Sequence, residues 1–290
     1  MGNDYITLKF LRDQGSKLPL PGEVLLISGP DEKVRFTLTK KVPGQWLGSV
    51  WHTLSLRSRR NVSRQMTGIV KALRRFTRPT AQKADGTPLE DFLVGRCLFR
   101  SPSCTQIGST TEEWLDALAP TLRGGLSNIH KTNDPVVIEE KLAELRANFP
   151  SGGPYYLTHG DLNFSNILVE GDKITAILDW EWSGFMPWWA ERLTAGGHNF
   201  PADEFLSRIW ANVEPELDEE TFISTVAVPV GKVKEAWDAC KVDHPNFKDR
   251  WVLPAFSECQ SAAGHINWFD CGNQVEHKIN PNQWDDEGQK

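Results

Sequence analysis

Three polar residues in one short stretch have the types and spacing that phosphoryl transfer requires. Asp161 belongs to the run H-G-D-L-N-F-S-N at residues 159–166, Asn166 follows it by five residues, and Asp179 follows Asn166 by thirteen. Transfer of a phosphoryl group from a nucleotide needs an acceptor for the proton of the attacking hydroxyl and hard oxygen ligands for Mg²⁺. Aspartate and asparagine side chains supply both kinds of group.

The residues between Asn166 and Asp179 predict a hairpin that brings the two together. The runs 167–169 and 174–179 are apolar and strand-like, and the sequence at 170–172 is a turn. Because a hairpin joins its own ends, both side chains can converge on one ion. Each residue alone has an ordinary structural explanation, since Asp and Asn in loops mostly form turns and caps. It is the joint pattern that indicates chemistry.

Apolar periodicity predicts the elements that must hold this stretch. A helix over 5–12 ends before L-P-L-P at 18–21, because proline cannot continue a helix. Two β-rich runs, 24–28 and 34–39, then form a hairpin around a Gly-Pro turn. The segment 77–109 is rich in turn formers and predicts a long loop. Helical stripes predict a helix from about Leu54 to Phe76, one over 115–129 interrupted by Pro120, one over 138–149, and helix starts near Asp203, Asp218 and Lys232.

Composition narrows the class of protein. The 290 residues are 39% hydrophobic and 24% charged, which is ordinary for a globular chain. No apolar run approaches the roughly 20 residues of a membrane span, so we expect a cytoplasmic protein without a membrane partner. Five scattered cysteines indicate neither a disulfide framework nor a zinc site. The net charge of −6 argues against nucleic acid and is compatible with a cationic small substrate.

The stretch from His159 to Phe185 resembles the signature of aminoglycoside phosphotransferase and choline kinase-type enzymes. It is most similar to the large fungal-type branch of that family, in which H-G-D-L-x-x-x-N-I-L-V and I-x-D-W-E-x-x-G recur. The segment F-T-L-T-K-K-V-P-G-Q-W-L at 36–47 is similar to the hinge strand and following turn of the family, and G-T-P-L-E-D-F-L at 86–93 also has a counterpart. The resemblance covers roughly residues 5–200.

This resemblance implies an α+β, protein-kinase-like fold. The N-terminal lobe is abbreviated to one helix and a β-hairpin, and the C-terminal lobe is largely helical. We therefore expect residues 1–45 to be the remnant of the nucleotide-binding lobe with its hinge. Residues 46–270 form the phosphotransferase lobe, and 271–290 form a polar tail.

Roles at the centre follow from the same resemblance. Asp161 becomes the catalytic aspartate that orients or deprotonates the acceptor hydroxyl. His159 supports the geometry of the catalytic loop, and it is the member with the simplest purely structural explanation. Asn166 and Asp179 become the ligands of Mg²⁺. Glu181 lies near the ion or faces the substrate, and both alternatives stay open.

The nucleotide contacts are carried over in the same way. The backbone at Thr39, Lys40 and Lys41 is expected to face the adenine of ATP or of another nucleoside triphosphate. The partner is a small hydroxylated molecule; family members act on aminoglycosides, choline, homoserine, sugars and other alcohols. Neither the acceptor nor the oligomeric state can be assigned from the sequence.

The sequence departs from the family pattern at the phosphate-binding lysine. Lys9 falls inside the first helix and Lys17 after it, so neither can occupy the place of the strand lysine. Asp4 is nearest in position to the glutamate that would pair with that lysine, and it is shorter. A shortened gene product, a slow enzyme and a pseudoenzyme all fit these residues. The favoured function is an ATP-dependent O-phosphotransferase, and the alternative is a non-catalytic binding protein on the same scaffold. A metal-dependent hydrolase is a distant third.

Overall fold

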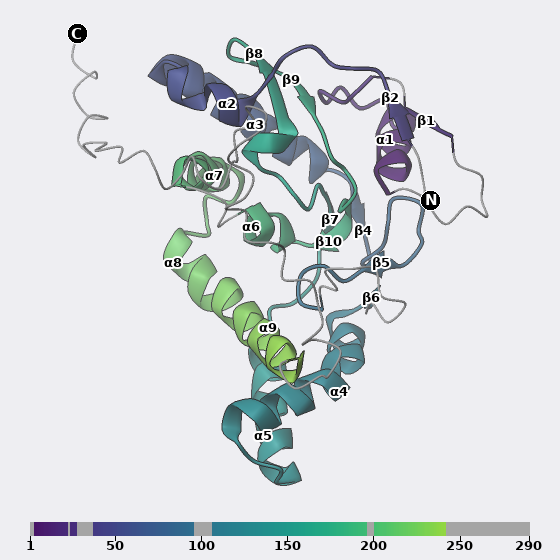
Figure 1. Ribbon diagram of the computed structural model, residues 1–290, viewed down its shortest axis with the longest axis vertical. Coiled ribbons are helices and arrows are strands. Elements are labelled where there is room, and N and C mark those ends of the chain that lie inside the picture. Colours follow the sequence, from purple (N-terminus) through teal and green to yellow (C-terminus); the bar gives the residue numbers. More distant parts are fainter. Residues whose placement is uncertain (1–2, 23, 28–36, 96–105, 196–199, 242–290) are drawn as a thin grey trace, which may run out of the picture. The chain divides into compact units, whose positions relative to one another are not determined.

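The computed structural model describes residues 3–22, 24–27, 37–95, 106–195 and 200–241, and for 200–204 and 241 the backbone alone (Figure 1). All of these residues belong to one unit that spans Met1–His244. The expected domain boundary after residue 270 and the polar tail lie outside the described residues. The expected boundary after residue 45 remains a prediction.

α-Helices make up about half of the described residues. No helix in these residues is long and apolar enough to cross a membrane. The helices are α1 (Asn3–Asp13), α2 (Leu47–Val50), α3 (Leu56–Leu73), α4 (Thr111–His130), α5 (Pro135–Asn148), α6 (Ala190–Ala195), α7 (Phe200–Val213), α8 (Glu219–Phe222) and α9 (Val228–Lys241). A 3-10 turn at Trp51–Thr53 joins α2 to α3, a π turn at Ile223–Ala227 joins α8 to α9, and a further 3-10 turn, η2 (Phe164–Asn166), lies between β7 (Tyr155–Thr158) and β8 (Ile167–Glu170).

The strands form four small antiparallel sheets within the described residues. Their orders are β1–β2, β10–β7–β4, β3–β8–β9 and β5–β6. Most of these strands are too short to show alternating apolar residues in the sequence. The strands are β1 (Val24–Leu26), β2 (Thr37–Thr39), β3 (Gln45–Trp46), β4 (Thr77–Arg78), β5 (Leu89–Glu90), β6 (Gln106–Ile107), β7 (Tyr155–Thr158), β8 (Ile167–Glu170), β9 (Lys173–Ile177) and β10 (Gly184–Pro187).

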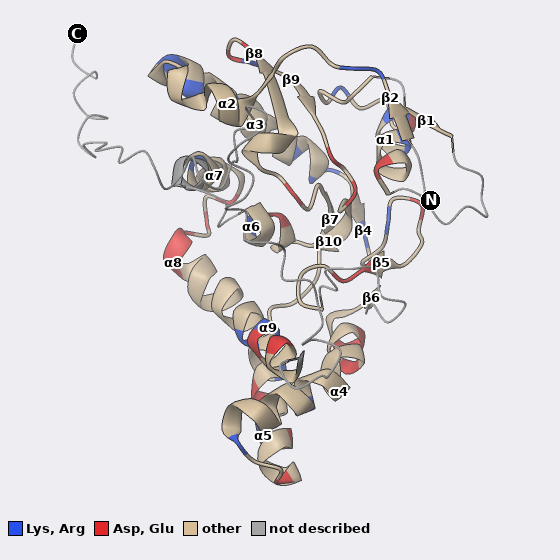
Figure 2. Ribbon diagram, in the orientation of Figure 1, with Lys and Arg blue, Asp and Glu red and all other residues tan. Residues whose placement is uncertain are grey.

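The long helix α3 confirms the predicted apolar stripe. Ser55 caps its N-terminus, because the Ser55 hydroxyl accepts a hydrogen bond from the backbone N–H of Ser58 at 3.1 Å. Lys and Arg residues lie along the helix (Figure 2). The buried members of the stripe are Val62, Met66, Ile69, Val70 and Leu73. This face packs beside β9 and α7 and thereby supports the hairpin that follows the catalytic loop.

Two details of the helical prediction are wrong. Helix α4 is continuous through Pro120, although an interior proline costs about 3 kcal/mol. Burial of one face of α4 against α9 and α5 outweighs that cost. The helix expected to begin near Lys232 instead begins at Val228 and runs on from α8 through the π turn. The expected start at Asp218 is confirmed, because Asp218 caps α8 through a bond from the Thr221 N–H at 2.7 Å.

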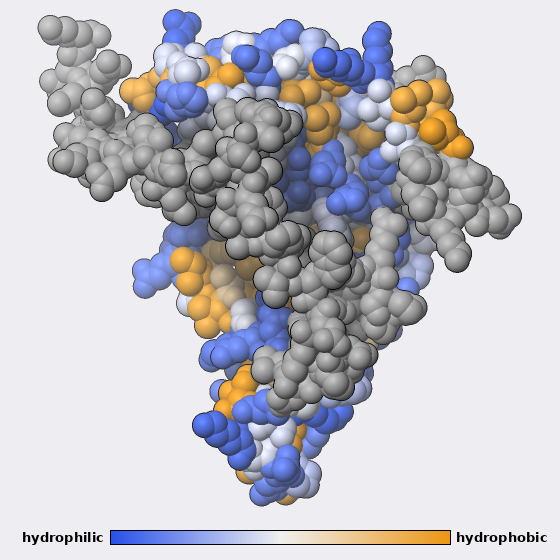
Figure 3. Space-filling model, viewed as in Figure 1, coloured by the Kyte–Doolittle hydropathy of each residue, from blue (hydrophilic) through white to orange (hydrophobic). Residues whose placement is uncertain are grey.

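The N-terminal part of the unit is held by α1. Arg12 of α1 donates to the carbonyl of Pro21 at 2.7 Å, and buried Val24 of β1 packs in the core. The outer face of the two-stranded β1–β2 sheet is apolar and exposed, and Figure 3 shows it as a hydrophobic patch. Its members are Leu25, Ile27 and Leu38, which are 48%, 63% and 58% exposed. The predicted hairpin is thus present in its strands, while its turn lies outside the described residues.

Candidate active site

Asp161 and Asn166 are brought together in the loop between β7 and β8. The amide nitrogen Nδ2 of Asn166 donates to the Asp161 carboxylate oxygen Oδ2 at 3.0 Å and to the Asp161 carbonyl at 2.8 Å. The other carboxylate oxygen accepts from Asn163 Nδ2 at 3.0 Å. Both oxygens are therefore oriented, and the side-chain oxygen of Asn166 stays available for a cation.

The hairpin brings the second half of the site back to Asn166. In the pairing of β8 with β9, Ile167 faces Ile177. One step further out, the backbone N–H of Leu178 donates to the carbonyl of Asn166 at 2.8 Å. Asp179 is the next residue, so the two ends of the hairpin meet as the sequence predicts.

His159 joins the catalytic loop to the end of β9. Its ring is fully buried, and burial lowers its pKa from 6.5 to about 4, so the ring is neutral near pH 7. Ring atom Nδ1 accepts from the Asp161 N–H at 3.2 Å, which places the ring proton on Nε2. That nitrogen donates to the Leu178 carbonyl at 2.8 Å. With both nitrogens occupied inside the protein, His159 fixes the backbone on either side of the site.

Gly160 and Glu191 hold the loop from behind. Gly160 has a φ of +86°, and a Cβ there would lie 2.6 Å from the carbonyl oxygen of Trp182, so only glycine fits. The buried carboxyl of Glu191, in α6, accepts from the His159 N–H at 2.6 Å and from the Gly160 N–H at 3.2 Å. Two backbone donors that the loop leaves without a strand partner are thereby satisfied.

Burial raises the pKa of Glu191 from 4.5 to about 7. The two backbone bonds and the charge of Arg74 act in the opposite direction. Arg74 itself is fixed, because it donates to Glu214 at 2.7 Å and lies 4.5 Å from the centre of the Tyr156 ring. Glu191 is a buried carboxyl whose ionisation is set by the fold.

Aromatic packing anchors the turn that carries Asn166. The ring of Phe164, in η2, lies 5.0 Å from the Trp51 ring and 5.1 Å from the Phe205 ring. Such aromatic contacts stabilise by about 0.5–1.5 kcal/mol each beyond the area they bury. Asn166 itself is buried at 7% exposure. The turn that carries the amide is therefore held between the 3-10 turn at Trp51–Thr53 and α7.

Carboxylates gather around Asp179. Burial raises the pKa of Asp179, and the nearby charges of Glu181, Asp161 and Asp4 raise it further. Asp179 also has a φ of +61°, the left-handed region that aspartate tolerates better than most residues. Helix α1 contributes Asp4 and is tied to the segment after β9, since Asn3 donates to the Glu181 carbonyl at 2.9 Å. Several carboxyl groups therefore lie near one another at this point and repel one another when they are charged.

The donor set fits a hard divalent cation bound through few protein ligands. Within the described residues, no Lys or Arg forms an ion pair with Asp4, Asp161, Asp179 or Glu181. No group of three His, Cys, Asp or Glu side chains in that part of the chain could enclose a metal. Mg²⁺ in nucleotide sites is held by one or two carboxylates, with water and phosphate oxygens completing its octahedron. The residues present fit that pattern.

Thr39, Lys40 and Lys41 lie apart from this cluster. They are exposed residues at the end of β2 and in the connection to β3. A Cβ on Gly22 would lie 2.9 Å from the Lys40 Cβ, so the connection runs close to the segment before β1. Among the described contacts, none of the three residues forms a hydrogen bond or ion pair with Asp161, Asn166 or Asp179. Their contact with adenine remains a prediction.

Glu191 is the residue at this site that the sequence patterns did not reveal. It lies 32 positions after His159, and no local periodicity connects the two. One signal exists in the sequence. F-M-P-W-W-A at 185–190 is an apolar run directly before Glu191, and a carboxyl that continues such a run is a candidate for burial.

The chain is similar to several proteins of known structure. Among solved structures, it is similar to an aminoglycoside phosphotransferase, APH(2″)-IIa, in a complex with streptomycin and ATP, with 14% identity, a TM-score of 0.47, and coverage of 80% of this chain and 69% of the other. It is also similar to a mutant of APH(4)-Ia in a complex with ADP and hygromycin B, with 17% identity, a TM-score of 0.47, and coverage of 82% of this chain and 72% of the other. For APH(2″)-Ib with bound ADP, the identity is 13%, the TM-score is 0.47, and the coverage is 81% of this chain and 82% of the other. A search of curated proteins finds no match.

A family model described as the phosphotransferase enzyme family matches residues 4–220. The matched range includes α1, the hinge segment, the catalytic loop and the β8–β9 hairpin, so it covers every element of the site described above. The α+β, protein-kinase-like fold expected from the sequence is confirmed. The chain belongs to the phosphotransferase enzyme family.

Proposed function

We propose that this protein is an ATP-dependent O-phosphotransferase. It moves the terminal phosphoryl group of ATP, or of another nucleoside triphosphate, to a hydroxyl of a small molecule. The observation that carries the proposal is the meeting of Asp161, Asn166 and Asp179. Asn166 bonds to the Asp161 carboxylate at 3.0 Å, and the residue before Asp179 bonds back to Asn166 at 2.8 Å.

Asp161 is suited to act on the acceptor hydroxyl. Its two carboxylate oxygens are oriented by Asn163 and Asn166, and neither amide neutralises its charge. A fixed, ionised carboxylate accepts the hydroxyl proton as the oxygen attacks phosphorus, which is then transferred from the leaving nucleotide oxygen. His159 and Glu191 keep the loop backbone in place and do not reach the substrate.

Asn166 and Asp179 are suited to hold Mg²⁺. That ion would supply positive charge that neutralises the nucleotide phosphates. The protein's own contribution is a set of oxygen atoms held close before the ion arrives. The raised pKa of Asp179, caused by burial and by its carboxylate neighbours, indicates the repulsion that a cation would relieve.

Asp161→Asn tests the proposal directly. Nucleotide binding is measured by isothermal titration calorimetry in the presence of Mg²⁺, and transfer is measured as acceptor-dependent ADP formation over a panel of hydroxylated small molecules. We expect transfer to fall by about 10²–10⁴-fold with nucleotide affinity nearly unchanged. The control is Asp116→Asn, because Asp116 forms only a surface pair with Arg146. Equal loss of binding and transfer would assign Asp161 a structural or metal-binding role.

One observation favours the alternative, a non-catalytic binding protein on the same scaffold. Asp4, the carboxylate on α1 that faces the site, accepts from the hydroxyl of Thr37 at 2.9 Å and pairs with no lysine among the described residues. A wild-type chain that binds nucleotide with Mg²⁺ but forms no ADP with any acceptor on the panel would establish this alternative.

A further inference from the structure

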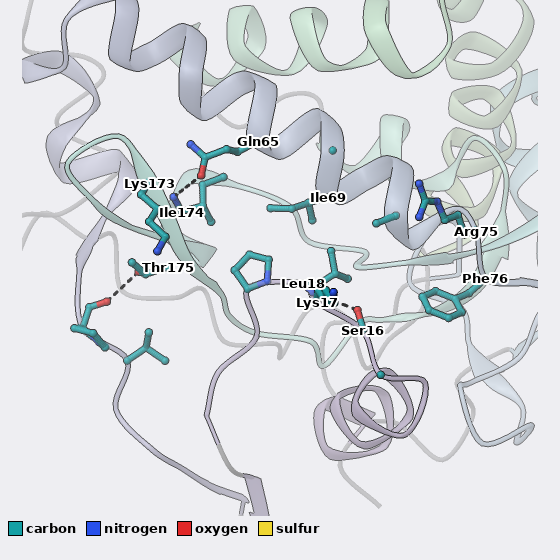
Figure 4. Close-up of a pocket in the computed structure, with 16 residues that line it drawn as sticks. Ser16, Lys17, Leu18, Gln65, Ile69, Arg75, Phe76, Lys173, Ile174 and Thr175 are labelled. Atoms are coloured by element: carbon teal, nitrogen blue, oxygen red, sulfur yellow. Dashed lines mark hydrogen bonds between the residues drawn. The ribbon is translucent and has the colours of Figure 1, made fainter.

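A second cleft lies away from the catalytic loop, behind the hinge segment. It has a volume of about 910 Å³ and is bounded by the segment 15–19, by Val42 and Pro43, by one face of α3 and by the start of β9 (Figure 4). None of its lining residues is among those assigned to phosphoryl transfer. Its size is within the range of small-molecule sites, about 300–1,000 Å³.

Helix α3 leaves the middle of the cleft hollow. Gln65 and Ile69 of α3 face the cleft, and the neighbouring helical positions that line it are Gly68 and Ala72. A Cβ added to Gly68 would meet no atom within 4 Å. Glycine inside a helix costs about 1 kcal/mol relative to alanine, so helical stability alone does not favour this residue.

The charge that lines the cleft is entirely positive. Lys17, Arg75 and Lys173 line it, and no carboxylate among the described residues does. In the described part of the chain, none of these three cations takes part in an ion pair. The whole protein carries a net charge of −6, so this local excess runs against the average of the surface. A concave surface lined by one sign of charge concentrates ligands of the opposite sign.

Two of the three uncharged polar side chains of the cleft are occupied by bonds within the protein, and the third, Ser16, accepts from the Leu18 N–H at 3.4 Å. Gln65 accepts from the Ile174 N–H at 3.0 Å and donates to the Asp172 carbonyl at 2.6 Å. The hydroxyl of Thr175 donates to the Pro43 carbonyl at 2.9 Å. The side-chain donors that remain for a ligand are therefore the three cations and the Ser16 hydroxyl, and this set favours an anion over a neutral polar molecule.

Two of the three cations lie at opposite ends of the cleft, with apolar side chains between them. Figure 4 shows Lys173 beside Gln65 at one end of the cleft, Arg75 beside Phe76 at the other, and Leu18 and Ile69 between them. At 1.5 Å per residue, α3 extends for about 12 Å from Gln65 to its end at Leu73, and Arg75 follows two residues later. We propose that this cleft binds an elongated small molecule that joins an anionic group to an apolar body.

Calorimetric titration of the whole chain with 1-naphthyl phosphate tests the proposal. This probe carries both features, and 1-naphthol and inorganic phosphate carry one each. We expect only the complete probe to bind. The cation that holds the phosphate is Arg75 or Lys173, and Arg75→Glu or Lys173→Glu at that end should weaken binding by about tenfold or more, since it replaces attraction by repulsion. Lys71→Glu is the matched control, because Lys71 is an exposed cation of α3 outside the cleft.

Gly68→Leu tests the shape of the site without changing its charge. The new side chain has free space and a higher helix propensity, so the variant should fold at least as stably and lose probe binding. Binding that survives Gly68→Leu overturns the proposal. So does equal affinity for 1-naphthol, which would indicate apolar contact alone, and so does equal weakening by Lys71→Glu, which would indicate attraction by overall charge.

Discussion

The catalytic segment (residues 155–195) and the N-terminal segment (the described residues of 3–39) achieve order in different ways. In the catalytic segment, buried hydrogen bonds cross from one element to another. His159 bonds to Leu178 at 2.8 Å, and Glu191 bonds to His159 at 2.6 Å. In the N-terminal segment, the two-stranded β1–β2 sheet packs against α1 on one side and exposes an apolar face on the other.

The difference matters for phosphoryl transfer, because its two parts have different needs. The hydroxyl and the reacting phosphorus must be placed to a fraction of an ångström, and fixed polar groups provide this placement. An isolated two-stranded hairpin is only marginally stable in water, so it depends on what packs against it. Under the proposed function, the segment proposed to act on the acceptor is preorganised by its own fold, while the segment proposed to face the nucleotide relies on α1 and on further contacts.

The largest expected effect concerns Asp179, where the preorganised region holds like charges together. Asp179→Asn should weaken Mg²⁺-dependent nucleotide binding by about 10²-fold, because one of the two proposed metal ligands loses its charge. The same change should leave the unfolding free energy unchanged or raised, since repulsion from Asp161, Asp4 and Glu181 is relieved. Calorimetry with and without Mg²⁺ and denaturant unfolding measure the two quantities.

Asp172→Asn is the matched control, because Asp172 lies at the opposite end of the same hairpin and uses only its carbonyl in bonds to Asn61 and Gln65. Nucleotide affinity that depends on Mg²⁺ equally in Asp179→Asn and in the wild type would remove Asp179 from the metal site. A large loss of stability would give Asp179 a structural role.

A second effect follows from the opposite pKa shifts of His159 and Glu191. The folded pKa of His159 is lowered to about 4, so its contribution to stability is present above pH 6.5 and lost as pH falls toward 4. The folded pKa of Glu191 is raised to about 7, so its contribution is present below pH 4.5 and lost as pH rises through 7. Between pH 4.5 and 6.5 the two contributions oppose each other.

Glu191→Gln removes one of these contributions and exposes the other. Relative to the wild type, the unfolding free energy of the variant should fall as pH is lowered from 7 to 4.5, by up to about 3 kcal/mol. Chemical denaturation at several pH values measures the trend. Glu112→Gln, at an exposed position of α4, should follow the wild type. Parallel curves for Glu191→Gln and the wild type would show that the Glu191 carboxyl does not titrate within the fold.

The sequence predicted the catalytic loop and its hairpin well because their information is local. The residues from 159 to 179 contain the loop, two apolar strands and the turn, so one short pattern determines which atoms meet. Long helices such as α3 were likewise visible from their apolar stripe. The continuity of α4 through Pro120 was not, because packing against α9 decides it and no local pattern reports that packing.

Contacts between distant segments were the other part that the sequence did not reveal. Glu191 bonds to the loop from 32 positions further along the chain, and the charge of Asp4, in α1, acts on Asp179 although the two are far apart in the sequence. Strands such as β4, of two residues, are too short for alternation to be detected. The cleft behind the hinge combines four segments, and none of them shows by itself that its cations are unpaired.

The smallest expected effect tests the exposed face of the N-terminal hairpin. Leu25 faces Leu38 across the β1–β2 pair, and both are about half exposed, at 48% and 58%. The double change Leu25→Thr with Leu38→Thr should alter the unfolding free energy by less than about 0.5 kcal/mol, because threonine suits a strand and little packing is lost.

Val24→Thr is the matched control on the same strand. Val24 is buried at 6% exposure, so placing a hydroxyl there should cost about 1–3 kcal/mol. Thermal and denaturant unfolding compare the variants. A double variant as destabilised as Val24→Thr would mean that the outer face is covered in solution, and sedimentation of the wild type would then show whether a second copy covers it.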